Sequence, residues 1–259
     1  QAQIAEYEER GYLLFPSLLD EEEVSSLSRE IPEILSRPGP EVIRERDDPQ
    51  MARLAFGLHV YSEPFKHLSL LPRLVDPIHQ LVKDDIYIHQ SRLNPKPGFG
   101  GGTRWDWHQD FATWHDRDGL AEPRALMVAV FIEHVTAVNA PLLIVPGSHR
   151  DGLVHDANDD REIGGYSIFN IPPPTLAELA KDRGIAAQTG PAGSVLICHS
   201  NIVHGSSNNI TPWPRTIFYL NLAASDNPPT IFKRAEHHCS RDWSPIEPLD
   251  EDCLLELAN

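Results

Sequence analysis

The stretch RALMVAVFIEHV, residues 124–135, is a nearly continuous apolar run and predicts a buried β-strand. A second run, PLLIVPGSH at 141–149, follows after a short turn, and GSVLICHS (193–200) and RTIFYLNLAAS (215–225) have the same character. Turns rich in glycine and proline, rather than regularly alternating helices, separate most of these segments. This order is typical of an antiparallel sandwich or barrel.

Upstream of this region, DIYIHQSRLN at 85–94 alternates with period two and predicts another strand. The start of the chain has a different pattern. Asp20 followed by Glu23 is a capping-box signal for a helix. Between residues 61 and 83, two helical patterns meet near Pro72. We therefore expect a mainly β fold with flanking helices that pack on one face.

We expect a single domain over residues 1–259, because no internal repeat or low-complexity linker divides the chain. Its predicted parts are a mostly helical segment at 1–84, a β core at 85–226 and an irregular tail at 227–259. The core carries an insertion at 150–190, which we expect to hold loops and one helix, and its position between strands allows a lid over a site.

The overall charge excludes some classes of partner. Lys and Arg number 22 and Asp and Glu 38, a formal net charge of −16, so a nucleic-acid or anionic-membrane surface is not expected. Three widely spaced cysteines without a CxxC pair argue against a disulfide framework or structural zinc site and fit a reducing compartment. We expect a cytoplasmic protein with a small-molecule partner; the oligomeric state, with a homodimer among the possibilities, stays open.

The segment WDWHQD, residues 105–110, carries the chemistry. On a strand, His108 and Asp110 would lie on one face because side chains alternate with period two. His204 supplies a third candidate ligand. Two histidines and one carboxylate leave three positions of an octahedron open, which suits iron(II), a bidentate co-substrate and dioxygen. Zinc is the competing metal, although a zinc site usually has one open position.

A basic residue that could bind a carboxylate follows His204 in the sequence. Arg215 lies eleven residues after His204, past the turn at 208–214. A guanidinium at this place could hold the far carboxylate of 2-oxoglutarate in a bidentate fork while the 2-oxo acid end binds the metal. The alternative is an ordinary surface arginine at a strand start.

With these residues, the chain resembles the phytanoyl-CoA dioxygenase superfamily, in the branch that holds ectoine hydroxylase, proline 4-hydroxylase and leucine hydroxylase. The resemblance implies a double-stranded β-helix (a cupin-like jelly roll) that uses Fe(II), 2-oxoglutarate and O2, with ascorbate as a stimulant. The matching stretches are YIHQSRLNPKPGFGG (87–101), WHQDFATWHDRDGL (107–120), PRAL (123–126), NAPLLIVPGSH (139–149), TGPAGSVL (189–196) and HGSSNNITPWPR (204–215).

The resemblance also implies roles for single residues. It makes His108, Asp110 and His204 the metal ligands and Arg215 the partner of 2-oxoglutarate, with Asn94 and Ser206 as hydrogen-bonding residues for the same co-substrate. The positions that match substrate contacts in ectoine hydroxylase are Gln90, Thr113, Trp114 and Arg241. A carboxylate at Asp110 favours hydroxylation over halogenation, because the related halogenases have a small residue there.

The chain departs from the ectoine hydroxylase pattern at several places. Gln109 stands between two ligands, as in the proline and leucine hydroxylases, Ala129 replaces a small polar residue, and the segment 234–239 is altered. Leu222 and Ala223 could enlarge the pocket or make it less polar.

We therefore predict hydroxylation of a small amino acid or amino-acid-like zwitterion. The alternatives are the same chemistry on a larger natural-product intermediate such as a terpenoid or alkaloid acid, a zinc hydrolase, and a non-catalytic cupin-like metal-binding protein.

Overall fold

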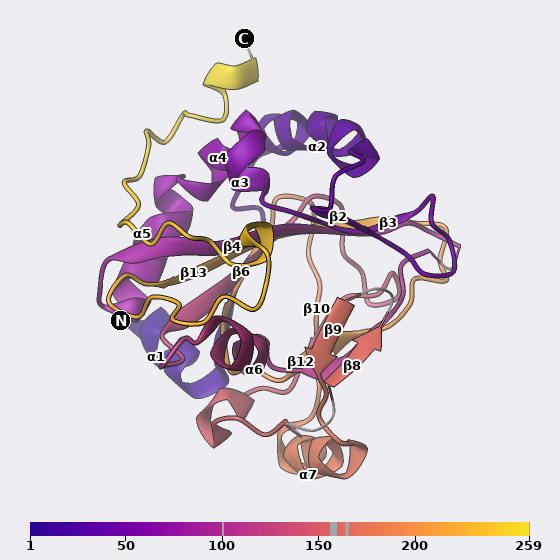
Figure 1. Ribbon diagram of the computed structural model, residues 1–259, viewed down its shortest axis with the longest axis vertical. Coiled ribbons are helices and arrows are strands. Elements are labelled where there is room, and N and C mark those ends of the chain that lie inside the picture. Colours follow the sequence, from indigo (N-terminus) through magenta and orange to yellow (C-terminus); the bar gives the residue numbers. More distant parts are fainter. Residues whose placement is uncertain (100, 156–159, 164–165, 259) are drawn as a thin grey trace.

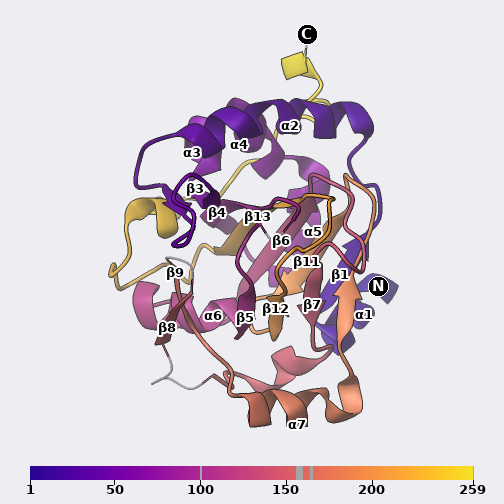
Figure 2. The ribbon, with the colours of Figure 1, turned by 90° about the vertical axis from the view of Figure 1, so that its right-hand side faces the viewer.

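The computed structural model describes residues 1–99, 101–155, 160–163 and 166–258. Two antiparallel sheets lie against each other, and Figures 1 and 2 show helices outside them. The larger sheet has the strand order β1-β11-β6-β13-β4-β3-β2. Its strands are β1 (Tyr12–Phe15), β2 (Val42–Arg44), β3 (Ala52–Phe56), β4 (Ile86–Lys96), β6 (Ala125–Phe131), β11 (Val195–His199) and β13 (Arg215–Ala224).

The smaller sheet has the order β10-β7-β12-β5. Its strands are β5 (Trp105–His108), β7 (Leu142–Ile144), β10 (Ala186–Gln188) and β12 (His204–Ser206). A separate hairpin is formed by β8 (Asp160–Ile163) and β9 (Tyr166–Phe169). The predicted jelly-roll core with flanking helices is confirmed by this arrangement of sheets.

Helices cover one face of the larger sheet and both ends of the molecule. Figure 2 shows α2, α3 and α4 along one end and α7 at the opposite end. The helical segments are α1 (Ala2–Arg10), α2 (Glu21–Ser36), α3 (Leu58–Tyr61), α4 (Glu63–Ser69), α5 (Pro72–Val82), α6 (Asp110–Thr113), the π-helix η1 (Trp114–Asp118), α7 (Pro173–Arg183), and the short 3-10 turns η2 (Ser148–Asp151), η3 (Glu236–His238) and η4 (Glu256–Ala258). The predicted capping box begins α2: Asp20 Oδ1 accepts from the Glu23 amide at 2.9 Å, and Glu23 Oε2 accepts from the Asp20 amide at 2.9 Å.

The two faces of β13 have different neighbours. Phe218, Leu220 and Leu222 are buried in the core that the helices share, together with Phe65 of α4 and Leu74 of α5. The alternate residues of the same strand point between the two sheets, with Met127, Ala129 and Phe131 of β6. The period-two pattern therefore directs one set of side chains to the helices and the other to the interior that holds the site.

Three local features differ from what the sequence predicted. Strand β3 was not predicted, and the insertion at 150–190 contains the hairpin β8–β9 as well as the expected helix; residues 156–159 and 164–165 of this insertion lie outside the described residues. The strand through the WDWHQD segment ends at His108, so Asp110 is the first residue of α6.

Within the described ranges, no helix is both long and apolar enough to cross a membrane.

Candidate active site

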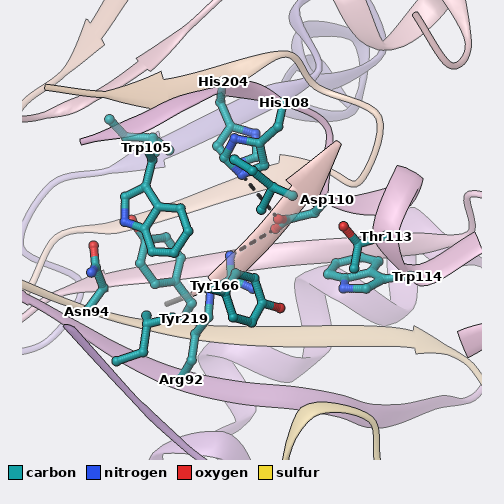
Figure 3. Close-up of a pocket in the computed structure, with 13 residues that line it drawn as sticks. Arg92, Asn94, Trp105, His108, Asp110, Thr113, Trp114, Tyr166, His204 and Tyr219 are labelled. Atoms are coloured by element: carbon teal, nitrogen blue, oxygen red, sulfur yellow. Dashed lines mark hydrogen bonds and ion pairs between the residues drawn. The ribbon is translucent and has the colours of Figure 1, made fainter. Parts of the chain in front are cut away.

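The three candidate ligands meet at the edge of the smaller sheet. His108 and His204 are direct partners in the antiparallel pairing of β5 with β12, and their ring centroids lie 4.2 Å apart. The chain turns after His108, and Asp110 Oδ1 then lies 3.6 Å from His108 Nε2. One possible ligand atom from each of the three residues falls within 4.8 Å of the others (Figure 3). Strand pairing and a helix start, rather than alternation along one strand, create the cluster.

Gln109, between two of these residues, stabilises the turn. Its Nε2 donates to the carbonyl oxygens of Gly152 at 2.7 Å and Asn201 at 2.8 Å, and its Oε1 accepts from the Val154 amide at 2.9 Å. The side chain is buried, with 1% of its surface exposed. Gln109 therefore ties the turn to two other segments and fixes where α6 starts.

Both histidines present the same ring nitrogen to the site. The Nδ1 of His108 lies 2.7 Å from the Asp106 carbonyl oxygen, and the Nδ1 of His204 lies 3.0 Å from the Ile202 carbonyl oxygen. Because a carbonyl only accepts, each Nδ1 carries the proton and each Nε2 keeps its lone pair for a metal. Burial lowers the pKa of His204 to about 4, with a further contribution from His108, so its imidazole stays neutral.

The carboxylate of Asp110 is ionised despite its burial. Burial alone would raise the pKa of this carboxyl, but the charge of Arg92 and then the closeness of His108 and His204 outweigh it and hold the pKa well below its usual range. Arg92 Nη2 donates to Asp110 Oδ2 at 3.0 Å. Two imidazole nitrogens and a carboxylate make a donor set that fits Fe(II).

Arg215 lies at the start of β13 and is completely buried. Its Nε donates to the Ala140 carbonyl oxygen at 3.0 Å and its Nη1 to Asn94 Oδ1 at 2.9 Å. Its buried Nη2 has no hydrogen-bond partner within the described residues. Burial lowers the pKa of Arg215. An unpaired guanidinium nitrogen in the interior is costly, and the carboxylate of 2-oxoglutarate would satisfy it.

A second buried cation lies near Arg215. Lys96, on β4, is fully buried and its Nζ donates to Ser206 Oγ at 2.9 Å. Its pKa is well below the usual range because of burial and then the charges of Arg215 and Arg53. Because Ser206 Oγ accepts from Lys96, its own proton is free to donate elsewhere. The sequence analysis missed Lys96, although it follows Asn94 at the period-two spacing that puts both on one face.

The pocket beside the cluster is lined by a mixture of aromatic, aliphatic and polar side chains. Asn94, Thr113 and Trp114, each singled out from the sequence, line it. The structure adds seven residues that were not: Leu54, Arg92, Trp105, Leu142, Tyr166, Ile168 and Tyr219. Figure 3 shows these side chains around the His108–Asp110–His204 cluster. Arg92 could have been found from its spacing to Asn94, whereas Tyr166 comes from the unpredicted hairpin.

Two of the predicted substrate contacts have other partners. Gln90 Nε2 donates to the His238 carbonyl oxygen at 2.6 Å, and Gln90 Oε1 accepts from Arg92 Nη1 at 2.7 Å. Arg241 donates to the carbonyl oxygens of Cys239 at 3.1 Å and Arg234 at 2.8 Å. Neither is among the residues that line the pocket. The structure therefore brings Thr113 and Trp114 to the site and holds Gln90 and Arg241 behind it.

A second group of possible ligands, His89, Asp118 and Cys239, is also buried. The carboxylate of Asp118 is already bonded: Arg234 Nε donates to its Oδ1 at 2.8 Å, and His89 Nε2 lies 3.0 Å from its Oδ2. Arg234 Nη1 in turn donates to the Tyr166 phenol oxygen at 2.9 Å. Arg234 and His89 together occupy both oxygens of Asp118, so this cluster is a hydrogen-bonded support for the pocket wall.

The fold and site define a jelly-roll protein with two histidines and a carboxylate beside a buried arginine. The model of the family described as phytanoyl-CoA dioxygenase (PhyH) matches residues 7–217. The chain belongs to this family of dioxygenases, as the sequence analysis predicted.

Named relatives agree with this assignment. The chain is 36% identical over 270 residues to an ectoine dioxygenase of Bordetella bronchiseptica, covering 98% of this chain and 87% of that protein. It is 34% identical over 257 residues to an L-proline trans-4-hydroxylase of Streptomyces griseoviridis, covering 96% and 95%. The crystal structure of EctD from S. alaskensis with 2-oxoglutarate and 5-hydroxyectoine superposes with a TM-score of 0.81 at 33% identity, covering 96% of this chain and 84% of that one.

Proposed function

We propose that this protein is an Fe(II)/2-oxoglutarate-dependent dioxygenase that hydroxylates an unactivated C–H bond of a small amino acid or amino-acid-like zwitterion, releasing succinate and CO2. The observation that carries the proposal is the combination of the His108–Asp110–His204 cluster with the orphaned Nη2 of buried Arg215. The named relatives include enzymes that act on ectoine and proline.

In this proposal His108, Asp110 and His204 hold the iron, and Arg215 binds the far carboxylate of 2-oxoglutarate. Asn94 orients Arg215 through its hydrogen bond to Nη1. Ser206 Oγ accepts a hydrogen bond from Lys96 and uses its own hydroxyl to donate a hydrogen bond to the co-substrate. Fe(II) with 2-oxoglutarate and O2 supplies the oxidising power for C–H cleavage. The protein binds and orients the reactants in a buried pocket.

The substrate pocket suits a compact molecule with an apolar or cationic part. Trp105, Trp114, Tyr166 and Tyr219 present aromatic surface, which attracts cations as well as apolar groups. Gln90 and Arg241 remain our predicted ligands of the substrate carboxylate. This role requires them to exchange their present backbone partners when the substrate binds.

The alternative of a larger natural-product substrate loses its main support. Leu222 packs in the helix-covered core, and Ala223 packs with Tyr87 behind Trp114. Neither residue lines the pocket. The two departures from the relatives therefore do not widen the site.

The test is succinate release by purified protein with and without Fe(II), 2-oxoglutarate and ascorbate, combined with a screen of amino acids and betaine-like solutes for a product heavier by one oxygen atom. We expect turnover only with both iron and 2-oxoglutarate. Asp110→Ala should lower it at least about 1000-fold, since it removes several kcal/mol of metal-dependent stabilisation. Full activity of Asp110→Ala or Arg215→Ala contradicts the site, and a zinc-dependent activity without 2-oxoglutarate contradicts the reaction.

A cytoplasmic location and a homodimer are part of the same proposal. The three cysteines are free and buried, which is compatible with a reducing compartment. Light scattering after size exclusion tests the dimer, and a fluorescent fusion in the source cell tests the location.

A further inference from the structure

The two oxygens of Asp110 face different partners. Oδ1 lies on the side of His108, 3.6 Å from its Nε2. Oδ2 accepts from Arg92 Nη2 at 3.0 Å (Figure 3). The two side chains are 13% and 10% exposed, so water screens this contact weakly. Arg92 therefore occupies one of the two oxygens that the carboxylate could offer to a metal.

Arg92 is itself held from several directions. Its Nη1 donates to Gln90 Oε1 at 2.7 Å, and that oxygen also accepts from Asn221 Nδ2 at 3.1 Å. Tyr219 is its direct neighbour across the β13–β4 pairing, and the guanidinium carbon lies 4.9 Å from the Tyr219 ring centroid. These contacts come from the central strands of the larger sheet, so the guanidinium cannot move aside without breaking them.

We propose that Arg92 is a positioning residue that restricts Asp110 to a single ligating oxygen. The inference rests on the proposed function, because it concerns the same metal. Three protein ligands with one atom each leave three of six positions, which a bidentate 2-oxo acid and O2 require. A carboxylate that rotated to bind through both oxygens would fill one of these positions. Arg92 thus keeps the co-substrate's place open.

The experiment uses the Co(II)-loaded full chain, because Co(II) can replace Fe(II) without reacting with O2 and reports its coordination by visible absorption. Arg92→Met removes the donor and keeps an apolar stem, whereas Arg92→Lys restores a single cationic donor. Arg124→Met is the matched control, since Arg124 bonds to Asp84, Glu122 and Asp226 outside the site. Calorimetry measures Co(II) binding and then 2-oxoglutarate binding.

We expect Arg92→Met to bind Co(II) at least as tightly as the unmodified chain, with an altered spectrum. Its 2-oxoglutarate affinity should fall by about 10-fold or more, a loss of at least about 1.4 kcal/mol, because the second carboxylate oxygen would compete for a position that the 2-oxo acid needs. Arg92→Lys should lie in between, and Arg124→Met should match the unmodified chain. Unchanged 2-oxoglutarate affinity and spectrum in Arg92→Met overturn the proposal, and so does loss of Co(II) binding in the folded variant.

A second variant protects the test if Arg92→Met does not fold. Gln90→Leu keeps the guanidinium but removes the acceptor of its Nη1. We expect a weaker effect in the same direction, and no effect overturns the proposal. If the unmodified chain itself binds neither Co(II) nor 2-oxoglutarate, the proposed function fails instead, so the two failures are distinguishable.

Discussion

The two faces of strands β4 and β13 contrast sharply. Leu93, Phe218 and Leu220 point to the helices and are fully buried among aliphatic and aromatic side chains. On the opposite face of the same strands, Arg92 and Arg215 lie among polar groups in the site. Residues one step apart in sequence therefore serve different ends, because side chains alternate across a strand.

The two faces show how the fold can bury charged groups whose desolvation lowers its stability. Burying Lys96 and Arg215 away from water disfavours folding, as their lowered pKa values indicate. Apolar burial on the helix-covered face offsets this cost, at roughly 25 cal/mol for each Å² removed from water. The larger apolar cluster lies on the helix-covered face, and the other face combines a smaller apolar cluster with unsatisfied polar groups for a ligand.

The largest expected effect is a loss of stability from a substitution on the apolar, helix-covered face. Phe218 is fully buried, and its ring centroid lies 4.9 Å from that of Phe65. Phe218→Ala should lower the free energy of unfolding by about 3–5 kcal/mol, because it leaves a cavity between sheet and helices. Urea unfolding measures the loss. At temperatures where the variant is folded, its affinity for 2-oxoglutarate should be unchanged; a parallel loss of affinity would mean that the two faces are not independent.

The next effect concerns acid sensitivity, part of which we place outside the site. Burial lowers the pKa of His59 to about 4, and burial followed by the charge of His149 lowers that of His199 to about 4. In the unfolded chain both pKa values return to about 6.5, so between these values only the unfolded state binds the extra protons. Stability should therefore be complete above pH 6.5 and fall as the pH drops toward 4, by up to about 3 kcal/mol for each histidine.

Urea unfolding across this pH window checks the slope. His199→Gln should reduce the pH dependence of the free energy of unfolding by the contribution of one proton. The reduction should be the same with and without metal, because His199 is not a candidate ligand. A slope that vanishes when metal is bound would place the acid sensitivity in the site instead.

Much of this contrast could be predicted from sequence. Apolar runs such as residues 124–135 predicted the strands, and His108, Asp110, His204 and Arg215 were found by residue type and spacing. Local patterns identify residues that share a face. They do not report partners that depend on pairing between distant strands, such as Asn221 of β13, whose Nδ2 donates to Gln90 Oε1 of β4 at 3.1 Å.

The hairpin β8–β9 shows a second limit. Its strands are short and partly exposed, so no apolar alternation identifies them. Tyr166 reaches the pocket from this hairpin and is bonded to Arg234, which lies in the altered tail segment. Such contacts arise only when the insertion and the tail fold onto the same side of the sheet.

The smallest expected effect tests this contact. Tyr166→Phe keeps the stacking on the ring of Phe56, whose centroid lies 5.7 Å away. It removes only the hydroxyl group, which accepts a hydrogen bond from Arg234 Nη1. The loss of one hydrogen bond should cost about 1 kcal/mol of stability, because Arg234 keeps its bonds to Asp118. A double-mutant cycle with Arg234→Met isolates the pair. If Arg234→Met costs the same in both backgrounds, the phenol is not bonded to Arg234, and the tail does not support the pocket wall through Tyr166.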